Sequence, residues 1–157
     1  LPGMGIEESG SEKRALVGVP ICYELLFPDL VRRFGLQGAG ALLAITNDAW
    51  YGRTGAPHQF LAMTAMRAAE NGIPVVRAAN TGVSALIDAR GRIQGRSPLF
   101  EEAYVVGTIE MPLVGDRNPA STFYARFGDL FVLICAFGCM AELIMQARAR
   151  RSQPDGA

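Results

Sequence analysis

The chain has very few of the residues that hold metals or contact nucleic acids. Its 157 residues include one histidine, His58, and one lysine, Lys13, and its acidic and basic residues balance to a net charge of zero. A balanced charge offers no electrostatic footprint for nucleic acid, so no nucleic-acid partner is expected. A lone histidine without neighbouring cysteine or carboxylate ligands makes no metal-binding pattern, and we predict neither a metal nor another cofactor.

Cysteine is also scarce, and three cysteines do not make a disulfide framework. Cys135 and Cys139 lie one helical turn apart in an apolar run, so we interpret them as small packing residues. The chain begins at Leu1, with neither an initiator methionine nor the pattern of a signal peptide. We therefore interpret it as the C-terminal portion of something longer, opening with a glycine-rich, charged loop over residues 1–14.

The third cysteine, Cys22, stands in a different context. The apolar run 17–21 ends at this residue, and Tyr23 and Glu24 follow at once. A strand that stops on a cysteine predicts a thiol on a turn at the edge of a sheet, where a substrate can reach it. The start of a helix there would supply backbone N–H groups and the positive end of a dipole.

These features predict that Cys22 attacks a carbonyl as a nucleophile. The backbone N–H of Tyr23 would then face the oxyanion, and the Glu24 carboxylate would support the site or hold its loop. A purely structural cysteine is the alternative. We expect His58 to lie on the surface at the start of a helix rather than to pair with the thiol.

Hydrophobic periodicity predicts a layered α/β domain over residues 15–121. Short apolar runs of strand length alternate with segments of helical spacing, and a hairpin turn is expected at 89–92. The helix that ends at Asn71-Gly72 is expected to bury a wide apolar face that includes Met63 and Met66. The predicted strands are 15–22, 41–46, 74–78, 83–88, a hairpin partner that begins at Ile93, and 104–111. The predicted helices are 25–34, where Pro28 fits the first turn, and 57–71.

A long apolar segment at 130–147 follows a junction at 122–129. Its only charged residue is Glu142, and its roughly 18 residues just reach the lower limit for crossing a bilayer. The residues after it are rich in arginine, namely Arg148, Arg150 and Arg151. The positive-inside rule then places the basic tail 148–157 in the cytoplasm and the α/β domain on the outer side of the membrane. The alternative is a buried helix at the end of the domain's core.

Five segments carry a resemblance to known proteins. They are Ile21-Cys22-Tyr23-Glu24 with Phe27-Pro28, the loop 46–52, the segments 58–63 and 67–70, the stretch 74–84, and residues 122–129 before the apolar helix. The first two resemble the nucleophile segment and the following loop of the nitrilase superfamily, the carbon–nitrogen hydrolases. Together the five resemble the C-terminal part of the bacterial apolipoprotein N-acyltransferase family.

The resemblance implies a fold, a reaction and a location. The fold is a partial nitrilase-type α-β-β-α sandwich followed by a C-terminal transmembrane helix, with the catalytic domain on the periplasmic side of the inner membrane. The reaction moves an acyl chain from a phospholipid donor to the α-amino group of a diacylglyceryl-apolipoprotein acceptor. The acyl chain passes through a thioester on the cysteine, here Cys22, in an enzyme that is monomeric at full length.

The resemblance also suggests residues around the thiol. We expect the loop after the second strand to border the acyl or substrate entrance, although shaping the loop is an equal alternative for its residues Asn47, Asp48, Trp50 and Tyr51. Two further residues, Arg77 and Asn80, are expected near the thiol, where they either brace the core or contact substrate.

The chain also departs from the family pattern. The family uses a Glu-Lys-Cys triad in which the glutamate base and the lysine lie well upstream of the cysteine. Lys13, Glu7 and Glu12 stand close before Cys22 in a polar loop, so we assign neither role to them. Only the cysteine of the triad is therefore expected in this chain, which alone should be inactive.

Two other readings of the chain stay open. One is a soluble nitrilase-type amidase, which would use the same thiol and fold without a bilayer. The other is a non-catalytic domain, tethered to the membrane, that binds lipoproteins or other envelope proteins.

Overall fold

The computed structural model describes residues 15–113 and 122–151. The predicted loop 1–14 and the end of the predicted tail therefore lie outside the described residues. The chain divides into two compact units, Leu1–Arg126 and Phe127–Ala157, and each is described by itself. Their boundary falls within the predicted junction.

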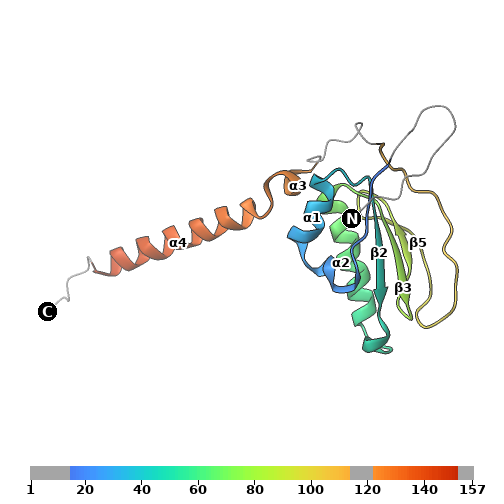
Figure 1. The fold of residues 1–157 in the computed structure, drawn as a ribbon. Coiled ribbons are helices and arrows are strands. Elements are labelled where there is room, and N and C mark those ends of the chain that lie inside the picture. The colour runs from blue at the N-terminus through green and yellow to red at the C-terminus, as the bar shows by residue number, and fades with distance from the viewer. Residues whose placement is uncertain (1–14, 114–121, 152–157) are drawn as a thin grey trace. The chain divides into compact units, whose positions relative to one another are not determined.

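A five-stranded mixed sheet forms the centre of the first unit (Figure 1). Its strands lie side by side in chain order: β1 (Val17–Gly18), β2 (Ala41–Asn47), β3 (Val75–Asn80), β4 (Ala85–Ile87) and β5 (Ile93–Arg96). β1, β2 and β3 are parallel to one another, whereas β4 and β5 continue the sheet in antiparallel pairs. The carboxyl ends of β2 and β3 consequently meet at one edge of the sheet, where Asn47 pairs in register with Asn80.

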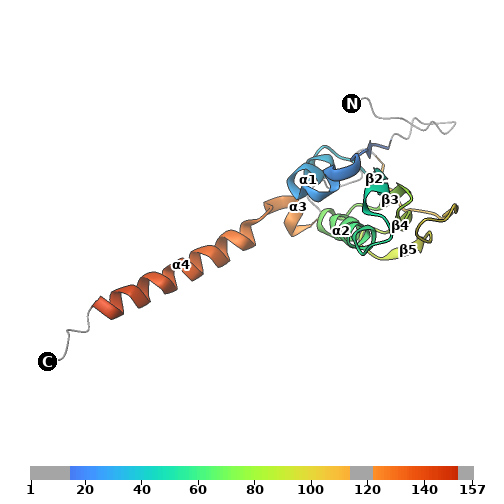
Figure 2. The ribbon, with the colours of Figure 1, turned by 90° about the horizontal axis from the view of Figure 1, so that it is seen from below.

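Parallel neighbours need crossover connections, and helices supply them here. These are α1 (Pro28–Leu36) and α2 (Ala56–Asn71), which cover the same face of the sheet (Figures 1 and 2). Pro28 occupies the first turn of α1, where its missing N–H costs no helical hydrogen bond. α2 ends at Gly72, whose left-handed backbone, with φ of 61°, lets its N–H reach carbonyls of the last turn. The predicted helix stop is thereby confirmed.

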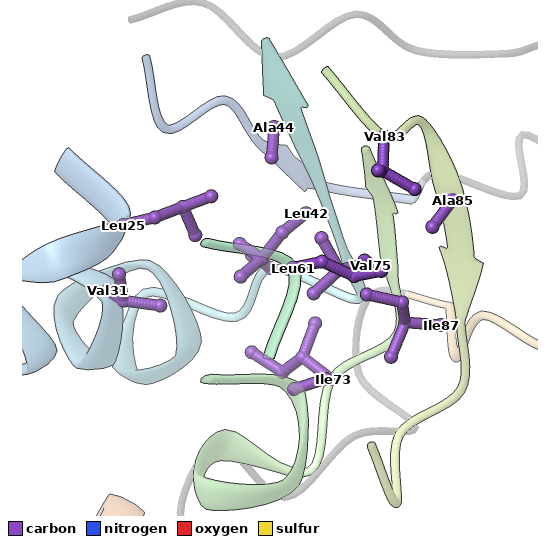
Figure 3. Packing of buried hydrophobic residues seen from close by; sticks show 12 residues of the cluster. Leu25, Val31, Leu42, Ala44, Leu61, Ile73, Val75, Val83, Ala85 and Ile87 are labelled. Carbon is purple, nitrogen blue, oxygen red and sulfur yellow. The ribbon is translucent and has the colours of Figure 1, made fainter. Parts of the chain in front are cut away.

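The hydrophobic core lies between the two helices and the sheet. β2 shows the alternation of a strand with one covered face, because Leu42, Ala44 and Thr46 are buried whereas Ile45 and Asn47 are exposed. Figure 3 shows side chains from the helical layer meeting side chains from the strands. The labelled members of this cluster are Leu25, Val31, Leu42, Ala44, Leu61, Ile73, Val75, Val83, Ala85 and Ile87.

The predicted first strand is much shorter in the structure than residues 15–22. β1 holds two residues, and only an isolated bridge between Ile21 and Ile45 extends the pairing. The interruption falls at Pro20, which has no N–H to give to the ladder, although its carbonyl accepts from Ile45 N at 3.3 Å.

The segment 25–34, predicted to be helical with Pro28 in the first turn of the helix, holds parts of two helices, and the second starts at Pro28 as predicted. A 3-10 helix, η1 (Cys22–Leu26), comes first, and Phe27 then has an extended backbone before α1 begins. The break follows from Pro28, because the ring of a proline disfavours helical backbone in the residue before it.

The predicted strand 104–111 is wrong, since no strand is assigned there. The segment lies across a face of the sheet: a Cβ on Gly107 would meet Leu86 of β4 at 2.5 Å. Backbone that lies on the face of a sheet cannot form hydrogen bonds with the strand at its edge.

The predicted apolar face of α2 is also wider than the buried face in the structure, because Met63 and Met66 are exposed.

The short helix α3 (Phe123–Phe127) lies just after Thr122, where the second described segment begins. Hydrogen bonds join this region to both crossover helices, α1 and α2. Arg32 of α1 donates from Nε to the carbonyl of Ala125 at 2.9 Å and from Nη2 to that of Arg126 at 3.1 Å. Thr122 donates its hydroxyl to the carbonyl of Glu70 at the end of α2. Part of the predicted junction is thus fixed to the first unit.

The second unit contains the helix α4 (Leu130–Arg151). Its candidate spanning stretch, Leu130–Arg148, has 19 residues, the most apolar 18 residues of which have a mean hydropathy of 2.1 and are not buried in the structure. By length and composition this helix could cross a membrane. Cys135 and Cys139, interpreted from the sequence as packing residues, are exposed on it.

The core should depend strongly on Leu42, which has no exposed surface. We expect Leu42→Ala to lower the free energy of unfolding by about 2–5 kcal/mol, because it removes buried methyl groups and leaves a cavity. Denaturant unfolding followed by circular dichroism in detergent would measure this. Leu36→Ala, at a side chain 41% exposed, is the matched control and should cost less than about 1 kcal/mol. Equal losses in the two variants would contradict this account of the core.

Candidate active site

Cys22 lies on a sharp turn at the carboxyl edge of the sheet. The bridge between Ile21 and Ile45 brings the chain to that edge, and η1 starts at the cysteine itself. The backbone of Cys22 has a φ of 52°, in the left-handed region that residues other than glycine seldom adopt. The thiol is half-buried rather than enclosed. This is the arrangement predicted for a nucleophile, with a backbone conformation the sequence did not indicate.

Glu24 holds this turn. Its Oε2 accepts from Ile21 N at 2.7 Å, while its own backbone N–H donates to Ile21 O at 3.1 Å. The two bonds close the first turn of η1 from both sides, in the manner of a capping box. Of the two roles expected for the Glu24 carboxylate, the geometry shows the one that holds the loop.

Tyr23 and Tyr51 form a hydrogen-bonded pair beside the thiol. The Tyr51 hydroxyl donates to the Tyr23 hydroxyl at 2.8 Å, and both rings pack against Phe60, with centroids 5.7 and 5.9 Å away. The hydrogen bond to Tyr23, with burial and the negative charges of Asp48 and Cys22 in support, raises the pKa of Tyr51 to about 12. Tyr51 is therefore neutral over the ordinary pH range.

Beneath the aromatic residues lies a buried ion pair between Arg77 and Asp48. Arg77 Nη2 and Asp48 Oδ2 are 2.7 Å apart, and neither side chain has exposed surface. Burial lowers the pKa of Arg77, and the negative charge of Asp48 and the hydrogen bond to it act in the opposite direction. Because both side chains are enclosed, the geometry supports bracing of the core, one of the two roles expected for Arg77.

The edge of the sheet beside the pair is polar. Asn80 donates from Nδ2 to Asn47 Oδ1 at 3.1 Å, and the same oxygen accepts from Ala49 N at 3.2 Å. Both asparagines are exposed, and Trp50 exposes 81% of its surface. A pocket of about 380 Å³ opens next to Asn80, between the turn after β3 and residues 97–103. The predicted site residues thus gather at one edge in two layers, one exposed and one buried.

The described residues place neither a histidine nor a lysine beside the thiol. His58 is exposed in the first turn of α2, as predicted. Within residues 15–113 and 122–151 there is no lysine, and no group of three metal-ligating side chains is found among the described residues. Sequence reasoning missed Phe60 as a site residue, because its apolar spacing marks only an ordinary core position.

The raised pKa of Tyr51 gives a direct test of the tyrosine pair. We expect Tyr23→Phe to bring it from about 12 down toward the ordinary value of about 10, because the acceptor of its proton is lost. In the unaltered protein the stabilisation from this shift is complete below the unfolded pKa and is lost as pH rises from 10 to about 12.

Nuclear magnetic resonance of ¹³C-labelled tyrosine would follow the titration. Tyr104→Phe, at a side chain 90% exposed, is the control and should leave the Tyr51 midpoint in place. A midpoint that stays near 12 in the Tyr23→Phe protein would exclude the pair as the cause.

Comparison with known proteins bears on the same residues. Residues 6–118 match the family described as carbon-nitrogen hydrolase. Two relatives are apolipoprotein N-acyltransferases: that of Geobacter metallireducens is 42% identical over 154 residues, covering 94% of this chain and 28% of that protein. That of Allorhizobium ampelinum is 46% identical over 126 residues, covering 75% and 23%. The chain therefore spans about a quarter of the length of the curated relatives it matches.

A solved structure shares the fold. The carbon-nitrogen hydrolase from Helicobacter pylori aligns with a TM-score of 0.50 at 17% identity, over 56% of this chain and 38% of that one. At this level of identity the likeness speaks for the fold alone. The family match, by contrast, includes the Cys22 turn and all five strands of the sheet. The chain belongs to the carbon–nitrogen hydrolase family.

Proposed function

We propose that this chain is part of an apolipoprotein N-acyltransferase in which Cys22 is the nucleophile. The observation that most supports this is the setting of Cys22: a half-buried thiol in left-handed backbone at a sheet edge, within a chain 42% identical to such an enzyme. The acyl donor is a phospholipid, and the acceptor is the α-amino group of a lipoprotein's N-terminal diacylglyceryl-cysteine.

The proposed reaction consists of two acyl transfers at one sulfur atom. The Cys22 thiolate attacks an ester carbonyl of the phospholipid, the ester C–O bond breaks, and lysophospholipid leaves with a proton. The resulting thioester is then attacked by the lipoprotein amine, which forms an amide, loses a proton and releases the thiolate. In both steps the oxyanion would accept from backbone N–H groups at the start of η1, Tyr23 N–H among them.

The described residues support the thiol more than they activate it. The Glu24 carboxylate is bonded to Ile21 N, and that of Asp48 is buried against Arg77. We propose that the glutamate base and the lysine of a Glu-Lys-Cys triad come from outside these 157 residues. The isolated chain should then show no turnover, and measurable acyl transfer by it alone would contradict this part of the proposal.

We also propose that α4 anchors the chain in the inner membrane. Its stretch Leu130–Arg148 has the length and hydropathy of a span. Arg148 ends this stretch, and Arg150 and Arg151 follow it. The positive-inside rule puts that basic end in the cytoplasm. The thiol would then face the periplasm, where both lipid substrates are accessible from the outer leaflet.

The thioester can be tested in a hybrid protein. The chain is grafted into the Geobacter metallireducens relative, in place of the 154 residues it matches, and the hybrid is incubated with a phospholipid that carries a labelled acyl chain. We expect label on Cys22 that neutral hydroxylamine releases, because hydroxylamine cleaves thioesters. Mass spectrometry of the labelled peptide would locate it.

Two variants separate the possible outcomes. Cys22→Ala should take up no label, whereas Cys139→Ala should be labelled like the unaltered hybrid, because Cys139 lies on α4. Stable label on the Cys22→Ala hybrid, or none on the unaltered one, would rule out the proposed intermediate. Release of ammonia from a small amide without acyl transfer would favour the amidase reading instead.

The membrane anchor has its own test. After alkaline carbonate extraction we expect the intact chain to stay in the membrane pellet, because a spanning helix is not released with peripheral proteins. A variant that lacks residues 130–147 should move to the supernatant. Release of the intact chain would instead favour a helix buried against protein.

A further inference from the structure

Each nitrogen of the Arg77 guanidinium makes a hydrogen bond, although the side chain lies in the core. Nη2 pairs with Asp48, Nε donates to Val83 O at 3.1 Å, and Nη1 donates to Thr64 Oγ1 at 3.1 Å. Asp48 is held equally well, because its Oδ1 accepts from the hydroxyl of Thr46 at 3.0 Å. A buried ion pair is weak evidence for stability, since desolvation offsets the attraction of its charges. Its directional bonds instead fix the positions of the groups around it.

The group next to the pair is Phe60. The Arg77 guanidinium carbon lies 5.4 Å from the centroid of the Phe60 ring. Thr64, which accepts from Arg77, in turn donates to the carbonyl of Phe60 at 2.8 Å. Arg77 therefore contacts the side chain of Phe60 directly and its backbone through one hydroxyl.

Phe60 connects the buried ion pair to the turn that carries Cys22. Its ring packs edge-on against Tyr23, the residue that follows Cys22. It also packs, at a tilt, against Tyr51, the hydrogen-bond partner of Tyr23. A continuous series of contacts thus runs from the buried ion pair to the neighbour of the thiol.

Gly82 is the second feature that fixes the pair. A Cβ at this position would lie 2.1 Å from Asp48 Oδ2, which is much closer than two atoms can approach without a bond. The carboxylate consequently fits only because residue 82 has no side chain. A methyl group there would displace Asp48 without removing any charge.

We propose that Arg77 and Asp48 are positioning residues for the reaction at Cys22, acting through Phe60 on Tyr23 and so on the backbone of the nucleophile turn. As a statement about catalysis this rests on the proposed acyl transfer. As a statement about the position of Tyr23 it can be tested without any substrate.

The substrate-free test uses the Tyr51 titration as a sign that Tyr23 is in place. The variant is Asp48→Asn with Arg77→Met, which removes both charges together, because a single change would leave an unpaired charge in the core. We expect the Tyr51 midpoint to fall from about 12 to the value that Tyr23→Phe gives, which is further than the loss of the Asp48 charge, one of the smaller causes of the shift, would bring it, while circular dichroism shows that the fold is kept. A midpoint that stays near 12 overturns the proposal.

Two further variants test whether a fall in the Tyr51 midpoint comes from the position of Tyr23. Gly82→Ala should lower the midpoint in the same way with all charges intact, so the proposal stays testable if the double variant does not fold. Arg92→Met is the matched control, because it breaks another arginine–aspartate pair, Arg92 with Asp88 at 2.6 Å, at an arginine side chain that is 71% exposed. It should leave the Tyr51 midpoint unchanged, and an equal fall there would overturn the proposal.

The catalytic arm is measured in the hybrid enzyme. We expect Gly82→Ala to lower kcat for acyl transfer by about tenfold with KM for phospholipid nearly unchanged, because a misplaced nucleophile loses transition-state stabilisation. Arg92→Met should keep both constants. A raised KM with unchanged kcat would overturn a positioning role. If the unaltered hybrid transfers no acyl chain, the proposed function fails, whereas the titration still decides whether the pair positions Tyr23.

Discussion

The arrangement of the site depends on one buried interaction, the ion pair of Asp48 and Arg77. With no exposed surface on either side chain, each charge is tolerated only because the other lies 2.7 Å away. The pair also constrains its neighbours: residue 82 must lack a Cβ, and residue 64 must offer a hydroxyl. These positions lie directly after β2, in β3, in α2 and in the turn after β3, so one interaction ties together the elements that surround the Cys22 turn.

The elements that could be predicted from the sequence are those governed by local backbone chemistry. Within a helix Pro28 fits only the first turn, and Gly72 readily adopts the left-handed backbone that ends a helix, so both predicted boundaries agree with the structure. The segment 104–111 has the composition of a strand, yet it lies across the face of the sheet. Whether an apolar segment pairs at an edge or covers a face depends on the surfaces that the rest of the fold leaves open. No local pattern contains that information.

In the candidate site, too, some features follow from the local sequence and others only from the packing of the fold. The thiol on a turn follows from an apolar run that stops at Cys22, whereas its left-handed φ does not, because nothing in the neighbouring residues demands it. Phe60 has the spacing of an ordinary core residue in α2. Only the packing of α2 on β3 shows that it lies between Arg77 and Tyr23. Asp48 and Arg77 could be named from the sequence like the exposed residues of the loop, whereas their burial and their pairing with each other needed the fold.

Support of the thiol and activation of the thiol are separate requirements, and the described residues meet the first. A thiol attacks as the thiolate, so a proton acceptor must be within reach. Near Cys22, however, the carboxylate of Glu24 caps η1 and that of Asp48 neutralises Arg77. Either carboxylate could accept the proton only by giving up the contact that shapes the site. A base supplied from outside the described residues would leave both contacts intact, which is why the proposed triad combines with this geometry without distorting it.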